Sequence, residues 1–406
     1  MPVVAAVVPT QGGSLSREFT GNGAKNAVAG RGFEFEGAVT ALYDTNILRD
    51  GGLFSQGRSR GDFLFTPTAT VRAGLPFGRQ QLFGTVIVGR DFYARNTDFD
   101  RLRLNLGGGV NLVVGPNCQG SLFAQYSEQQ GRQLDLVNNI PNKQQDTVYQ
   151  ANVGCGRARG LGFGGGFTRL ETGNGNPLYR LFDSQTSTLT ANARFNGGQI
   201  GTLTLSGTYS DVGYPNRQGA IAANGQGDGV KVYSGQVAYR REIGPSISAN
   251  IGVSYIDVKP KLSGGGFAAP GYSGPGFDVS LTYHPGVRLS GTLSASRNVT
   301  ASSNVGASYA IDGSYALDLY YKLSPRLNAA VGGSINSRDY RGAFTSAIDP
   351  IARGTDTLHR GYASVSYSPT RLYSVDLTVA QQGRRSTPDL FNFDSTSAAV
   401  TLRVKI

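Results

Sequence analysis

The stretch FEFEGAVTALYDTNILRD, residues 33 to 50, alternates between apolar and polar side chains from its first residue. Phe33, Phe35 and Tyr43 fall on odd numbers, whereas Glu34 and Glu36 fall between them. Successive side chains of a β-strand point to opposite faces. The stretch therefore predicts a strand with one apolar face, aromatic near both ends, and two carboxylates on the other face. Such a strand suits a wall between lipid and water.

The same alternation recurs to the end of the chain in segments of about 10 to 14 residues, a length typical of transmembrane barrel strands. The count is about 18, and single-chain bacterial barrels have an even number of strands. We expect strands over residues 33–43, 61–74, 80–93, 98–114, 119–129, 146–158, 161–171, 185–196, 200–212, 230–243, 246–258, 276–284, 287–297, 306–323, 326–340, 356–368, 371–383 and 395–406.

The connections between these segments alternate between short and long. Short turns rich in Gly and Pro join every second pair, at 75–78, 115–117, 158–160, 196–198, 243–246, 284–287, 323–326 and 368–371. Mostly longer segments rich in Gly, Asn and Asp lie between them. Short turns at one rim and long loops at the other are typical of outer-membrane barrels. The sequence thus predicts an all-β fold, a single transmembrane antiparallel β-barrel over residues 32–406 with short periplasmic turns and longer extracellular loops.

Composition agrees with this fold. The chain has 406 residues, of which 58 are Gly and 20 Tyr, and only 16% are charged. No run of 18 apolar residues occurs, so we expect no transmembrane helix. The mean hydropathy of −0.22 fits a barrel, since only alternate residues face lipid. We expect residues 1–31, which open with MPVVAAVVPTQ, to be a residual export signal and a disordered segment.

Two stretches near the amino terminus are ALYDTNILRD (41–50) and GDFLFTPTATVRAG (61–74). Both resemble segments of a family of outer-membrane β-barrels encoded with exopolysaccharide operons. The resemblance implies a polysaccharide-associated porin of the bacterial outer membrane. It is carried by Tyr43, Asp44, Asn46, Arg49, Asp62 and Pro67. A plainer interpretation also stands, in which Asp44 and Asn46 only begin a loop, because both residue types tolerate turn conformations.

Charge is the most informative feature for function. The chain has 38 basic and 27 acidic residues, a formal net charge of +11. Basic residues inside a pore favour anions, so we expect an anion-selective channel. The same charges could instead screen one another or contact lipopolysaccharide phosphates at the rim. Alternation places these residues in the lumen: Glu34, Glu36, Arg101, Arg103, Arg194, Arg288, Asp318, Lys322, Asp376, Arg403 and Lys405.

The chemistry of an enzyme is not expected. His284 and His359 are the two histidines, and they fall at opposite rims, too far apart to share a site. The Gly-rich string at 160–166 is not followed by a helix, which a phosphate-binding loop requires. Two cysteines cannot build a zinc site, so we expect no cofactor and no metal. The basic residues are dispersed along strands, which argues against nucleic-acid binding.

Two cross-strand pairings follow from the strand order. Cys118 and Cys155 fall near one short-turn rim on neighbouring strands, and the periplasm oxidises such pairs, so we expect a disulfide. Glu34 and Glu36 should meet Arg403 and Lys405 where the first strand closes on the last. The last strand ends in Ile406 instead of the aromatic residue usual for recognition by the barrel assembly machinery.

These patterns lead to one expected function and two alternatives. We expect a channel for export or passage of an acidic exopolysaccharide. A general porin for small solutes, or a structural barrel that partners a secretion complex, would fit the same sequence pattern. The expected partners are outer-membrane lipid and lipopolysaccharide, the barrel assembly machinery and an exopolysaccharide secretion complex.

Overall fold

The computed structural model describes residues 32–51, 57–131, 140–217, 228–261, 271–301, 307, 309–341 and 354–406. The expected export signal at 1–31 therefore lies outside the described residues. The strands are β1 Gly32–Asp44, β2 Asp62–Phe77, β3 Gln80–Tyr93, β4 Arg101–Val114, β5 Cys118–Gln130, β6 Lys143–Gly156, β7 Gly160–Asn174, β8 Ser184–Asn196, β9 Thr202–Tyr214, β10 Asp228–Ile243, β11 Ile247–Pro260, β12 Tyr272–Tyr283, β13 Leu289–Ala301, β14 Tyr309–Lys322, β15 Leu327–Arg341, β16 Thr355–Tyr367, β17 Tyr373–Ser386 and β18 Phe393–Lys405.

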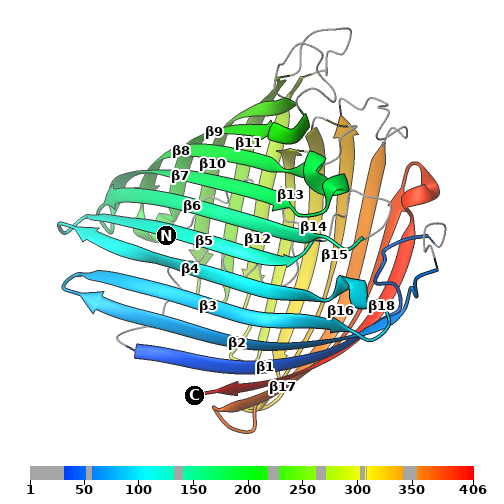
Figure 1. Cartoon of the computed structure of the whole chain (residues 1–406). Coiled ribbons are helices and arrows are strands. Elements are labelled where there is room, and N and C mark those ends of the chain that lie inside the picture. Colours follow the sequence, from blue (N-terminus) through cyan, green and yellow to red (C-terminus); the bar gives the residue numbers. More distant parts are fainter. Residues whose placement is uncertain are drawn as a thin grey trace.

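These strands form one closed antiparallel barrel of 18 strands in which each strand pairs with its neighbours in sequence. Closure comes from β1, which pairs with both β2 and β18 (Figure 1). Glu36 lies opposite Lys405 at this closing ladder, and Asp44 lies opposite Ser397. Closure gives every described strand a paired neighbour on both sides over most of its length, as a β-sheet needs in order to span a lipid bilayer.

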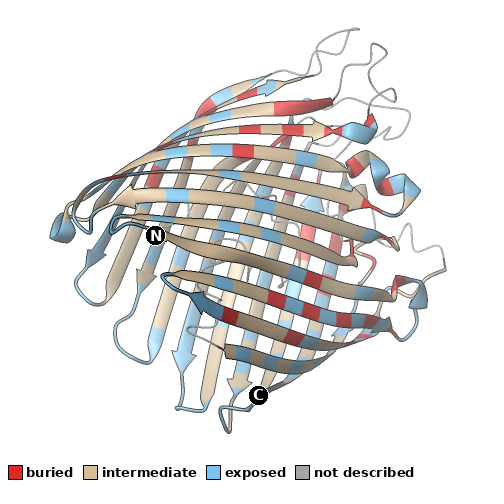
Figure 2. Ribbon diagram, turned by 60° about the vertical axis from the view of Figure 1, so that its left-hand side comes forward, coloured by how far each residue is buried: buried red, intermediate tan, exposed pale blue. Residues whose placement is uncertain are grey.

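The two faces of the wall follow the alternation in the sequence. Along β1, the side chains of Phe33, Phe35, Val39 and Tyr43 are between 38% and 62% exposed on the outer face. Buried residues concentrate toward the rim that carries the long connections (Figure 2), where Leu48, Leu64 and other apolar side chains form small clusters. Among the described residues, no helix is long and apolar enough to cross a membrane.

The predicted fold and strand count are confirmed, and the predicted strands differ from the observed ones mainly at their ends. The connections at the long-loop rim also carry single 3₁₀ turns: η2 (Thr97–Phe99), η3 (Pro177–Phe182), η5 (Pro215–Arg217) and η6 (Asp389–Phe391). The eight short turns lie at the opposite rim, as expected. One of them contains η4 (Gly198–Ile200).

Candidate functional site: the channel lumen

Hydroxyl and amide side chains line much of the inner wall at middle height, and they bond to one another across strands. Thr40 lies 2.9 Å from Thr401 across the seam, measured between their hydroxyl oxygens, and Thr188 lies 2.9 Å from Ser210. Elsewhere Gln125 donates to Asn105, and Ser314 donates to Asn336. Each of these pairs joins neighbouring strands. The result is a hydrophilic surface that carries little net charge.

The carboxylates of the opening stretch lie at the seam, in a cluster of acidic and basic groups. Arg72 of β2 contacts both, at 3.0 Å from Glu34 and 3.4 Å from Glu36. Lys405 of β18 is slightly farther, at 3.7 Å from Glu34 and 3.5 Å from Glu36. The structure thus brings the first and last strands together at these residues. Arg72, which sequence reasoning missed, makes the shortest contacts, because the β1–β2 register places it directly opposite Glu34.

Other predicted pore-lining residues also have partners. Arg403 pairs with Asp376 of β17 and lies 3.9 Å from Glu36. Arg103 contacts Asp91 at 3.3 Å. Tyr362 donates a 2.7 Å hydrogen bond to Asp318. Most of these charges are therefore compensated locally rather than directed at a passing solute.

Four basic residues that were predicted to line the lumen do not take part in these salt bridges. Three of them lie on strands, and the fourth is Arg288. Arg101 donates to the carbonyl of Asp100 at 2.7 Å. The guanidinium of Arg194 lies over Gly156 and Gly162 on the inner face. Lys322 is the exposed last residue of β14. Arg194 and Lys322 make no ion pair in the part of the chain that the structure describes.

Arg288 is not on a strand, which corrects the expected strand over 287–297. Strand β13 begins at Leu289, and Arg288 lies in the exposed turn that precedes it. Its carbonyl accepts a 2.7 Å hydrogen bond from the backbone N–H of Lys322 at the end of β14. The turn covers residues 284–288, one residue more than the expected 284–287.

The residues that carry the family resemblance form a buried polar cluster at the long-loop rim. Arg49 donates to both oxygens of Asp44, at 3.0 and 2.6 Å, and the Asp44 side chain is only 4% exposed. Asn46 donates to the carbonyls of Asp50 and Asp394. These contacts tie the end of β1 to β18, so Asp44 and Asn46 do more than begin a loop.

The rest of that motif fixes the neighbouring strands. Asp62 accepts hydrogen bonds from the backbone N–H of Arg95 and of Asn96 at the end of β3. Pro67 lacks an N–H, and the β2–β3 pairing is interrupted between Phe65 and Thr68. The ring of Tyr43 packs outside the barrel with its centroid 4.8 Å from that of Phe63. The motif residues therefore shape the rim around the seam.

The upper part of the β13–β14 hairpin turns inside the barrel. Strands β12 and β13 pair from Tyr283 only as far as Phe277 and Arg297, whereas β13 and β14 stay paired to Ala301 and Tyr309. Tyr309 is 2% exposed, although Tyr315 and Leu317 on the same face of β14 point to lipid at 52% and 47%. The face of β14 that contacts lipid in the middle of the wall is thus buried inside the barrel near the long-loop rim.

The surface that receives this hairpin is the inner wall of β9 to β12. Val299 and Tyr309 pack in one apolar cluster with Val212, Val230 and Val258 of that wall. The backbone can come so close because β12 has a glycine there. A Cβ on Gly276 would lie 2.8 Å from the carbonyl oxygen of Arg297 and 2.5 Å from Ser254 Oγ. The hairpin therefore narrows the lumen near the long-loop rim.

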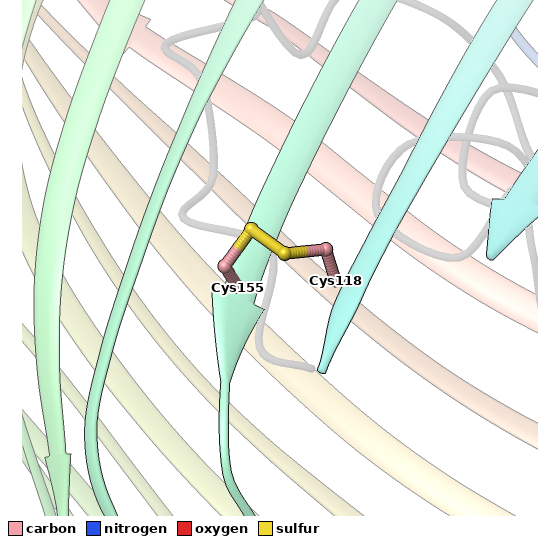
Figure 3. The surroundings of a disulfide bond; sticks show 2 residues. All are labelled: Cys118 and Cys155. Atoms are coloured by element: carbon pink, nitrogen blue, oxygen red, sulfur yellow. A yellow bond between two sulfur atoms is a disulfide. The ribbon is translucent and has the colours of Figure 1, made fainter. Parts of the chain in front are cut away.

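Cys118 and Cys155 form a disulfide that joins β5 to β6 (Figure 3). The two residues are direct cross-strand partners with their Cα atoms 4.0 Å apart. By alternation they share the outer face with Leu122 and Val153. The bond lies outside the lumen, beside the short turn at 115–117.

Outside the strands, the η3 connection holds an acidic residue with an altered titration. Burial raises the pKa of Asp183, although hydrogen bonds from Asn174 and Asn216 partly offset the effect. Burial likewise raises the pKa of Tyr179 in the same connection. This compact loop stands at the rim and not inside the channel.

The two histidines do not share a site. His284 lies in the turn before β13 and His359 lies near the opposite end of β16, as expected. Within the described ranges, no group of three or more His, Cys, Asp or Glu side chains could hold a metal ion.

Comparisons with known proteins agree with this geometry. The family described as Putative beta-barrel porin 2 matches residues 263–406. Among solved structures, the Pseudomonas aeruginosa porin OccK2 (OpdF), determined in complex with glucuronate, has a TM-score of 0.50 at 11% identity, over 92% of this chain and 98% of that one. No curated protein matches the chain.

Two further structures are less similar. The outer-membrane protein OpdK from Pseudomonas aeruginosa has a TM-score of 0.49 at 9% identity, over 92% of this chain and 99% of that one. A bacterial polysaccharide outer membrane secretin has a TM-score of 0.40 at 10% identity, over 92% and 98%. The likeness to OccK2 shows that the chain has the fold of an outer-membrane porin barrel, and the family match over residues 263–406 agrees with this fold.

Proposed function

We propose that this outer-membrane channel passes an acidic exopolysaccharide. The observation that carries the proposal is the inner wall, where hydroxyl and amide groups dominate at middle height and most charges are paired. A polysaccharide presents many hydroxyl groups, which exchange hydrogen bonds readily with such a wall. An apolar or strongly charged lining would hold a polymer too weakly or too tightly for passage.

The preference for an acidic polymer rests on two basic side chains. Arg194 and Lys322 face the lumen by alternation near the short-turn rim and make no ion pair among the described residues. Each could attract a uronate carboxylate without first breaking a salt bridge. A barrel of about 16–18 strands is wide enough for an aqueous channel.

Single-channel recording in a planar bilayer tests the proposal. Oligoglucuronates of increasing length, added from the short-turn side, should interrupt the current for times that grow with chain length. Neutral dextran oligomers of equal length should give shorter interruptions. In the Arg194→Gln/Lys322→Gln variant the difference between acidic and neutral oligomers should shrink, whereas Arg169→Gln, on the outer face at the far rim, should leave it unchanged.

The alternative functions predict different single-channel current recordings. A general small-solute porin would conduct, but oligomer length and charge would not change the dwell time of the interruptions. A structural barrel of a secretion complex would show no conductance at all. Either result would contradict polysaccharide passage.

A further inference from the structure

The short turns at the periplasmic rim contain arginine as their only charged residue type. The connections comprise residues 78–79, 115–117, 157–159, 197–201, 244–246, 284–288, 323–326 and 368–372. They contain no Asp or Glu, and every arginine in them is exposed. We call these six residues the arginine collar: Arg79, Arg157, Arg159, Arg288, Arg326 and Arg371.

The collar differs from the basic residues of the lumen, which are mostly paired. In the part of the chain that the structure describes, none of the six collar residues forms an ion pair. Arg79 donates to the carbonyl of Gly115 in the next turn at 2.9 Å, and the guanidinium of Arg159 lies beside Gly198 of another turn. The collar therefore presents uncompensated positive charge.

Exposed apolar side chains flank the collar in the same turns or at the strand ends beside them. Phe77 is 75% exposed next to Arg79, Val287 is 95% exposed next to Arg288, and Leu372 is 51% exposed. On a transmembrane barrel such side chains belong at the membrane interface. Arginine stems lie along apolar surface while their charged ends reach the polar layer. The guanidinium groups are thus at the height of lipid phosphates, which they can bind through two parallel hydrogen bonds.

We propose that the arginine collar binds the headgroups of anionic phospholipids in the periplasmic leaflet. The observations favour a lipid over a soluble polyanion, because each apolar neighbour holds its arginine at the lipid interface. The proposal is independent of the substrate of the channel, since the collar lies in the turns and not on the inner wall. Its consequence is a fixed height of the barrel in the membrane.

The absence of tryptophan from the sequence makes a clean fluorescence test possible. Phe77→Trp places a reporter beside the collar. Phe63→Trp is its matched control, because Phe63 is on the same strand and face, 61% exposed, at the opposite rim. There the nearby Arg58 and Arg60 are paired with Asp98 and Asp50. Each single-Trp protein is reconstituted in vesicles that contain brominated phosphatidylglycerol or brominated phosphatidylcholine, and quenching is compared.

The expected preference of the Phe77→Trp reporter for phosphatidylglycerol is about fivefold at low salt, the attraction of one arginine for an anionic surface. The preference should be smaller for Phe63→Trp. It should fall toward one in 1 M salt, where the Debye length is ~3 Å, and in a variant with all six collar arginines changed to Gln. The shift in electrophoretic mobility on boiling verifies that each variant is folded.

Equal quenching by the two lipids at Phe77→Trp would overturn the proposal. So would a preference that persists in the folded sixfold variant. If quenching is equal and polygalacturonate blocks the current from the periplasmic side only when the collar is intact, the collar binds a soluble polyanion instead. Either result leaves the test of the proposed function unaffected, because that test depends on Arg194 and Lys322.

Discussion

Arg72 illustrates how a single residue can hold the charges of the seam together. Its guanidinium contacts Glu34 and Glu36, which lie two residues apart on one face of β1. Lys405 is more distant from both and its side chain is 50% exposed. Arg72 is only 18% exposed, so water screens its interactions less.

We therefore expect Arg72→Gln to destabilise the barrel more than Lys405→Gln. The loss of free energy of unfolding should be about 1 kcal/mol for Arg72→Gln and about 0.2–0.5 kcal/mol for Lys405→Gln. Urea titration of the micelle-bound protein measures both. In a double-mutant cycle with Glu36→Gln, the effect of Arg72→Gln should diminish, and equal effects of the two basic residues would contradict the argument.

Arg49 and Asp44 form a more buried pair at the opposite end of β1. The two side chains are 14% and 4% exposed and share two hydrogen bonds. Removal of one partner leaves a buried charge, at a cost of ~3–5 kcal/mol in deep interiors. Because Asp44 also accepts from Ser395 and the backbone of Asn46, we expect a smaller loss.

Arg49→Ala should lower the free energy of unfolding by about 2 kcal/mol and expose the connection between β1 and β2 to proteases. Limited proteolysis followed by mass spectrometry locates the cuts. Arg169→Ala is the control, because its partner Glu171 is 38% exposed and an exposed pair contributes little. Unchanged resistance to proteolysis in Arg49→Ala would show that this polar cluster does not stabilise the rim.

At the scale of elements, alternation predicted the strands well, because every strand separates lipid from water and each slip of one residue would exchange the two faces. Turn positions were also predictable from Gly and Pro. The inward turn of the β13–β14 hairpin was not, since Val299 and Tyr309 continue the alternation of the strands below them. Only the end of the β12–β13 pairing in the structure shows that the upper part of the hairpin is buried inside the barrel and does not face lipid.

Alternation also had limited power to predict the candidate site. Alternation placed most of the charged lumen residues, but it could not tell paired charges from free ones. Arg403 pairs with Asp376, and Arg103 pairs with Asp91, through contacts that depend on register. For Arg72 the signal was present: pairing Glu34 with the inner face of the second strand would have found it.

Gly276 is the element-scale test of the hairpin. Gly276→Val would place side-chain atoms against the carbonyl of Arg297, and overpacking of this kind costs ~1–3 kcal/mol. We expect the hairpin to move off the inner wall and the single-channel conductance to rise. Gly235→Val is the control, because no atom lies within 4 Å of a Cβ at that position. Unchanged conductance in folded Gly276→Val would show that the hairpin does not limit the channel.

The disulfide between Cys118 and Cys155 closes a segment with a sequence separation of 37 residues, which includes β5, β6 and their connection. A cross-link of this span typically stabilises by ~2–4 kcal/mol. The double variant Cys118→Ser/Cys155→Ser should therefore lose heat resistance in the folded band on an unboiled gel. Its conductance should be unchanged, because the bond lies on the outer face. A change in conductance would place the bond in the lumen.

At the scale of the whole molecule, the net charge of +11 is distributed unevenly. Much of the charge on the inner wall is compensated in pairs such as Arg338 with Asp312, whereas the arginine collar, Arg194 and Lys322 have no such partners among the described residues. Among the described residues, uncompensated positive charge is thus gathered at the periplasmic mouth. A field confined to one mouth can select ions only where salt does not screen it.

This distribution predicts an anion-selective channel whose selectivity depends on salt. In a tenfold gradient of potassium chloride centred near 0.1 M, where the Debye length is ~10 Å, the reversal potential should have the sign of chloride permeation. Near 1 M the Debye length falls to ~3 Å and the selectivity should largely disappear. Changing Arg194 and Lys322 together to Glu should weaken the preference for chloride at low salt, because four units of charge change within the mouth. Arg169→Glu, on the outer face at the far rim, should leave the preference unchanged. A cation-selective reversal potential in the unmodified protein would show that the extracellular loops, and not the periplasmic mouth, set the field along the channel.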